Sequence, residues 1–219
     1  MSLVLIRAGL VAALAIAGGQ LPVSAQGVER PMTAADLPTR LAPATRQTIA
    51  HLGDSLRAVG LPDAPLYAKA AEGVLKGAAD ARILVVLRTL ARELGDARSS
   101  LGGDAGEAEL VAGASALHVG AFPAMLRQLR ETHAGVPGEP KSLATPLVAL
   151  ADLLARRVPP GVAAAAIDSL VARGAPSDDF AALRAAVERD IDAGRAPEAS
   201  VVQRTQGLLR NIEGRRRTP

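Results

Sequence analysis

The stretches 154–160 (LARRVPP) and 191–197 (IDAGRAP) place the same kinds of residue at the same positions. Each begins with a branched aliphatic residue, has a turn residue in the middle and ends with proline. The stretches 117–123 (LHVGAFP) and 74–80 (VLKGAAD) follow the same rule, with aspartate last in the second. Glycine is common just after a helix end, and proline or aspartate is common at a helix start. Each stretch therefore predicts a tight turn between two helices.

The middle residues of these stretches recur at a nearly constant spacing of about 37–43 residues. They are Gly77, Gly120, Arg157 and Gly194. The spacing predicts a repeated unit of helix, tight turn and second helix. A chance alignment in an alanine-rich helical chain is the alternative, since the units share few identical residues. The expected units, after a first helix near 43–59, lie at about 64–98, 107–134, 145–173 and 179–213.

Apolar residues between the turns recur every three or four positions. Ile83, Leu87, Leu90 and Leu94 show this spacing, and almost no segment alternates in the manner of a strand. The sequence therefore predicts an all-α fold, an array of antiparallel helical hairpins with about nine helices. The array could form either a compact bundle or a short α-solenoid.

The first 25 residues have the pattern of a secretory signal peptide. Arg7 precedes an uncharged run, 8–19 (AGLVAALAIAGG), and the segment ends in the small residues 23–25 (VSA). The run is too short to span a bilayer. We expect cleavage after Ala25 and Sec-type export to the periplasm or beyond the cell; an uncleaved anchor and a buried helix are the alternatives. A lipoprotein is not expected, because no cysteine follows.

The remaining chain divides into three expected parts. Residues 26–41 contain two prolines and little periodicity, which predicts a loose N-terminal lead-in. Residues 42–214 are expected to form a single all-helical domain whose last helix ends at Gly214. Residues 215–219 are expected to form a basic tail.

The composition excludes several kinds of site. The 219 residues include no cysteine, no tryptophan, one tyrosine and two phenylalanines. Without thiols there can be no disulfide, zinc-thiolate site, iron–sulfur cluster or cysteine nucleophile. Few aromatic side chains are available to stack on single-stranded nucleic acid, and the net charge is only +3. The sequence therefore predicts no nucleic-acid partner and no cofactor.

The histidines do not form a metal-binding motif. His51 stands apart from the others, three residues before Asp54, whereas His118 and His133 lie near the ends of successive expected helices. The latter two either approach each other or are separate, partly exposed residues, and the second arrangement is the simpler. Phosphate-loop and serine-hydrolase motifs are absent. We therefore predict no catalytic and no metal-binding residues.

Most acidic residues have a structural interpretation. Glu72 and Lys76 are four residues apart, which predicts an ion pair along a helix. Glu188, Asp190 and Asp192 are expected to lie on a solvated helix face.

The C-terminal arginines are the one candidate binding feature. Arg210, Arg215, Arg216 and Arg217 lie at or after the expected end of the last helix, and they account for the excess of basic residues downstream of Ala25. Positive charge at a helix end complements the helix dipole, which is the simplest explanation. The alternative is a weak, salt-sensitive attachment to an anionic membrane surface.

Three functions are compatible with these observations. The first is an exported, non-catalytic helical-repeat protein that binds a protein or peptide partner in the cell envelope, because stacked repeats form extended surfaces. The second is a protein that binds anionic lipid or another polyanion of the envelope through its C-terminal arginines. The third is a hydrolase whose catalytic residues are dispersed over several helices. The sequence leaves the partner and the oligomeric state open.

Overall fold

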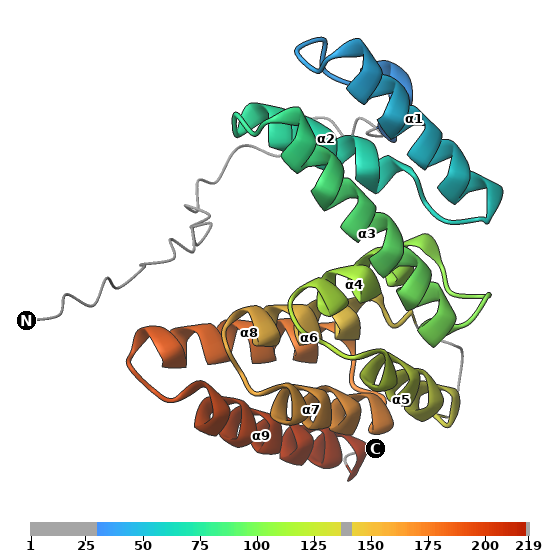
Figure 1. Ribbon diagram of the computed structural model, residues 1–219. Coiled ribbons are helices and arrows are strands. Elements are labelled where there is room, and N and C mark those ends of the chain that lie inside the picture. Colours follow the sequence, from blue (N-terminus) through green and yellow to red (C-terminus); the bar gives the residue numbers. More distant parts are fainter. Residues whose placement is uncertain (1–29, 137–141, 218–219) are drawn as a thin grey trace, which may run out of the picture. The chain divides into compact units, whose positions relative to one another are not determined.

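The computed structural model describes residues 30–136 and 142–217, and within these ranges it contains helices and no strand (Figure 1). The predicted all-α fold is therefore confirmed. Nine α-helices follow one short 3-10 helix: η1 Ala34–Asp36, α1 Pro43–Ala58, α2 Ala64–Leu75, α3 Asp80–Leu101, α4 Glu107–His118, α5 Pro123–Ala134, α6 Ala144–Ala155, α7 Pro160–Ala172, α8 Ser177–Asp192 and α9 Pro197–Arg217.

The helices follow one another along the chain as the sequence predicts. The hairpins α2–α3, α4–α5, α6–α7 and α8–α9 coincide with the four expected units to within a few residues, and α1 is the expected preceding helix. Pro43, Pro123, Pro160 and Pro197 each occupy the first position of a helix. Proline is tolerated there because the first backbone N–H groups of a helix have no partner within the helix.

The turns inside the four hairpins share one backbone geometry. The φ angles of Gly77, Gly120, Arg157 and Gly194 are 71°, 110°, 62° and 82°. In each turn the next residue donates its N–H to the carbonyl five residues earlier, with N–O distances of 2.9–3.1 Å. This is the Schellman arrangement that ends many helices. Arg157 is the one non-glycine residue with positive φ in the described chain, so the turn is repeated even where glycine is not.

The helices of the unit that begins at Pro31 pack in two rows. α1, α3, α5, α7 and α9 pack one after another, and α4, α6 and α8 form a second row. All extensive contacts join helices that are neighbours or next-but-one neighbours in the chain. Each hairpin thus buries its apolar face against the next, which is the packing of stacked helical repeats in an α-solenoid.

The core is continuous along these rows. Its buried residues, mainly leucine, alanine and valine, form one cluster that runs from Leu37 to Ile212. Small residues allow the helices to approach closely: a Cβ atom on Gly113 of α4 would lie 3.1 Å from the Cβ of Ala97 in α3. Similarly, a Cβ on Gly53 of α1 would lie 2.0 Å from the hydroxyl oxygen of Tyr67 in α2. A Cβ at Gly53 would therefore overlap the tyrosine, and one at Gly113 would require the neighbouring side chains to shift by a few tenths of an ångström.

Polar side chains connect successive units. Arg40 Nη1 donates to the carbonyl of Val74 over 2.8 Å, and Arg98 Nη1 donates to the carbonyl of Gly60 over 2.8 Å. The partners are 34 and 38 residues apart, about one repeat. Both arginines thus bind carbonyls at or just after a helix end, where the regular bond from the N–H four residues later is not made.

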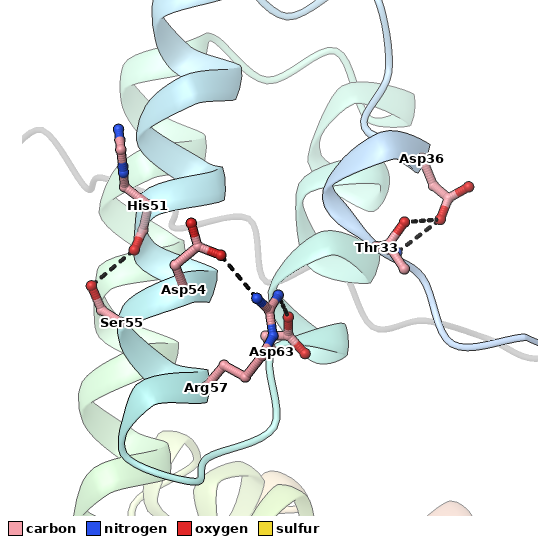
Figure 2. A network of polar contacts seen from close by, with 7 residues as sticks. All are labelled: Thr33, Asp36, His51, Asp54, Ser55, Arg57 and Asp63. Carbon is pink, nitrogen blue, oxygen red and sulfur yellow. Dashed lines mark hydrogen bonds and ion pairs between the residues drawn. The ribbon is translucent and has the colours of Figure 1, made fainter.

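The segment that contains η1, α1 and the start of α2 also carries polar contacts on its surface. Arg57 near the end of α1 binds Asp54 over 2.9 Å and also binds Asp63, the residue before α2 (Figure 2). A second, separate pair joins Thr33 to Asp36 around η1, where the Thr33 N–H donates to Asp36 Oδ2 over 2.8 Å. These contacts hold the ends of short elements and are exposed, so each contributes little to stability.

The N-terminal lead-in is not loose over its whole length, contrary to the prediction for residues 26–41. From Pro31 onward it belongs to the compact unit, and Leu37 and Leu41 are buried. Two leucines four residues apart give the segment an apolar side, and Arg40 attaches it to the end of α2. Residues 26–29, like the predicted signal peptide at 1–25, lie outside the described residues.

The last helix does not end at Gly214, contrary to prediction. α9 continues to Arg217, so residues 215–217 belong to the helix. An interior glycine costs a helix only about 1 kcal/mol relative to alanine, and arginine favours helix. Moreover, Arg215 Nη2 donates to Asp179 Oδ2 in α8 over 2.6 Å, which holds the final turn against the preceding helix.

Candidate functional site: a groove between α2, α3 and α4

The second row of helices is interrupted at its start. α4 packs extensively on α6, and α6 on α8, but α2 makes no comparable contact with α4. α2 and α4 have 12 residues each, whereas α3, which packs on both, has 22. At 1.5 Å per residue α3 is about 33 Å long, long enough for the two short helices to pack on it without packing on each other.

A groove of about 510 Å³ occupies this interruption. Most of its surface is aliphatic. Val86 and Leu90 are one helical turn apart on α3, and Val111 and Ala114 are likewise on one face of α4. The residues that line the groove are Pro65, Ala68, Lys69, Glu72, Val86, Leu90, Glu93, Val111, Ala114, Ser115, His118 and Val119.

No protein-family model, curated protein or solved structure matches this chain. The chemistry of the groove is therefore the basis for assigning a function.

One end of the groove is basic. A second hollow of about 580 Å³, next to the α2–α3 turn, shares Lys69, Glu72 and Val86 with the groove and adds Lys76 and Arg82. Lys69 Nζ lies 2.8 Å from Glu72 Oε2, and Lys76 binds the other oxygen of Glu72, which confirms the predicted Glu72–Lys76 pair. Hydrogen bonds from the two lysines hold the pKa of Glu72 below its usual value.

The other end of the groove carries an acid and a histidine. His118 Nδ1 lies 3.1 Å from Glu93 Oε1, and the Glu93 side chain is only 12% exposed. The partner of His118 is thus a residue of α3, and no contact joins His118 to His133 in the described chain. His51 on α1 does not line the groove, and the nearby Asp54 binds Arg57 (Figure 2).

Among the described residues that line the groove, only Ser115 carries a hydroxyl group. The Ser115 hydroxyl also lines the groove, but it donates to the carbonyl of Val111 over 2.9 Å. Within residues 30–136 and 142–217, no group of three or more acidic or histidine side chains could hold a metal ion. What the groove can do chemically is bind an apolar surface in its middle and an anionic group at its basic end.

Among the arginines singled out in the sequence, Arg210 and Arg215 have described side chains. Arg210 is exposed on α9, whereas Arg215 is bound to Asp179, a side chain with 11% exposure. The side chains of Arg216 and Arg217 lie outside the described part of the chain. Arg215 therefore has a structural role in joining α9 to α8.

The prediction of a solvated face for Glu188, Asp190 and Asp192 is wrong for Asp190, which is 4% exposed. Its two carboxylate oxygens accept hydrogen bonds from Arg204 of α9 over 2.6 and 2.8 Å. These bonds lower the pKa of Asp190. The residue pairs the helices of the last hairpin, a contact that a pattern within α8 alone does not reveal.

Sequence reasoning missed the groove, although two signals for it were present. The spacing from Gly77 to Gly120 is longer than the two later spacings, because α3 is the long helix. In addition, Lys69 and Lys76 are two of the three lysines in the sequence. Neither signal by itself shows that α2 and α4 are apart.

None of the helices in the described ranges combines the length and apolar character needed to cross a bilayer.

Proposed function

We propose that this protein is an exported, non-catalytic helical-repeat module of the cell envelope, and that its groove binds an amphipathic helix of a protein partner. The single observation behind this proposal is the interruption of the second row. α4, α6 and α8 pack directly on one another, while an open groove occupies the place between α2 and α4. A partner helix in the groove would continue the row.

The lining supports this choice of occupant. A helix with apolar residues at positions i, i+3, i+4 and i+7 presents an apolar stripe that can pack on Val86, Leu90 and Val111. Lys69, Lys76 and Arg82 at the basic end complement acidic residues beside that stripe. The groove has an apolar middle and a charged end, and this combination suits one amphipathic helix.

The alternative functions have less support. Arg215 is engaged by Asp179, which reduces the positive charge available for contact with an anionic envelope surface. The hydrolase alternative would need a nucleophile next to His118, and the Ser115 hydroxyl is bonded to the backbone instead.

The test uses a displayed library of amphipathic helical peptides with a fixed leucine stripe and random residues elsewhere. Peptides selected on the wild-type protein are then measured against Ser115→Tyr, which fills the groove with a neutral ring. Ser99→Tyr is the matched control, because Ser99 is also exposed, also donates to the carbonyl four residues earlier and does not line the groove.

We expect Ser115→Tyr to weaken binding about tenfold or more, and Ser99→Tyr to leave it unchanged. A second pair, Val86→Asp in the groove and Val85→Asp outside it, where Val85 is 60% exposed, should give the same contrast. Thermal melting checks that each variant is folded. The proposal is wrong if no peptide is selected, or if the selected peptides bind the groove variants and their controls equally well.

A further inference from the structure

The groove and the hollow beside the α2–α3 turn form one continuous surface. They share Lys69, Glu72 and Val86. The aliphatic part therefore leads directly into the basic part, and a single ligand can contact both. A partner helix that lies in the groove would bring its flanking residues to this end.

The basic end has positive charge that the protein itself does not neutralise. Three cations, Lys69, Lys76 and Arg82, accompany one carboxylate, Glu72. Each lysine uses one of its three ammonium donors for Glu72, so the others can bind a further acceptor. Arg82 is exposed, and within the described residues its guanidinium has no ion pair or side-chain hydrogen bond.

The two ends of the groove differ in charge. At the end opposite the lysines, the Glu93 carboxylate has His118 as its neighbour. A second carboxylate placed there would meet a like charge, whereas at the α2–α3 turn it would meet three cations. The charge difference therefore specifies where along the groove an acidic group lies.

We infer that the partner helix carries an aspartate or glutamate beside its apolar stripe, and that this carboxylate binds Lys69, Lys76 and Arg82 at the α2–α3 end of the groove. The inference rests on the proposed function and adds the charge and the orientation of the partner.

The experiment uses one peptide selected on the wild-type protein, its counterpart in which each acidic residue beside the stripe is replaced by lysine, and the variant Arg82→Glu. Arg82 is the cleanest position, since no ion pair is lost when it changes. Arg127→Glu is the matched control, because Arg127 is exposed on α5, has no ion pair in the described residues and lines neither hollow.

Selected peptides should be enriched in acidic residues at one end of the stripe. Arg82→Glu should weaken binding of the acidic peptide about tenfold and strengthen binding of its lysine counterpart. Arg127→Glu should change the binding of neither peptide. If Ser115→Tyr abolishes binding but Arg82→Glu has no effect, or if acidic residues are not enriched, this inference is overturned and the proposed function stands. If Ser115→Tyr has no effect, the proposed function fails first.

Discussion

Arg157 occupies a backbone position that glycine occupies in the three equivalent turns, with φ of 62°. A side chain in this left-handed conformation costs roughly 1–2 kcal/mol, because Cβ crowds the following carbonyl. The turn nevertheless keeps its hydrogen bond from Val158 to the carbonyl of Leu153, at 3.1 Å. The surrounding hairpin therefore imposes the conformation on Arg157.

Replacing Arg157 with glycine should stabilise the protein by about 0.5–1 kcal/mol. The relief of strain exceeds the entropy that glycine loses on folding. The reverse change in an equivalent turn, Gly194→Arg, should cost about 1 kcal/mol. Urea unfolding midpoints at pH 7 measure both. If Arg157→Gly lowers the midpoint, the side chain of Arg157 contributes more than the strain it causes.

At the level of the elements, Glu109 joins the beginnings of α4 and α6. It is 8% exposed. One oxygen accepts the backbone N–H of Gly106 at 3.1 Å, and the other accepts the N–H of Leu143 at 2.6 Å and the hydroxyl of Ser142 at 3.2 Å. A negative charge at two helix N-termini is favourable for both helix dipoles. The two hairpins are thus connected by one buried carboxylate.

Glu109→Ala should cost about 2–3 kcal/mol, because the buried N–H of Leu143 loses its acceptor. Glu107→Ala is the control: Glu107 is also in the first turn of α4 but is exposed, and its loss should cost about 0.5 kcal/mol or less. Chemical denaturation of the two variants gives the comparison. Equal losses would mean that the contact with α6 adds nothing.

At the level of the whole described unit, the groove limits how the first helices are joined to the others. The extensive contacts of α1 and α2 are with each other, with η1 and with α3. α6, by contrast, packs on α4, α7 and α8. In an array with contacts only between near neighbours, local unfolding spreads through these contacts. We therefore expect α1 and α2 to open separately from α6 to α9.

Leu66→Ala, at a fully buried position in α2, should raise amide hydrogen exchange in η1, α1 and α2 and leave α6 to α9 nearly unchanged. Leu150→Ala, fully buried in α6, should raise exchange in both α4 and α8. Each truncation should lower the free energy of unfolding by about 2–5 kcal/mol, a change that hydrogen exchange can detect. A uniform increase over all helices for Leu66→Ala would show that the unit unfolds as one.

The sequence alone was sufficient for the helices, the hairpins and the register of the repeat. Pro123, Pro160 and Pro197 mark helix starts, and the spacing of Gly77, Gly120, Arg157 and Gly194 placed even the non-glycine turn correctly. These features depend on neighbours within about one helical turn, so their signals lie close together in the chain.

Only the tertiary structure decided which residues meet between helices. Asp190 and Asp179 lie on α8 with acidic neighbours, yet each binds an arginine of α9. The groove depends on the separation of α2 from α4, which follows from the length of α3 and from how all three pack. Such contacts join residues 14 and 36 positions apart, and no local pattern encodes them. The physical reason is that local preference sets where a helix begins and ends, whereas the positions of whole helices follow from the core they bury together.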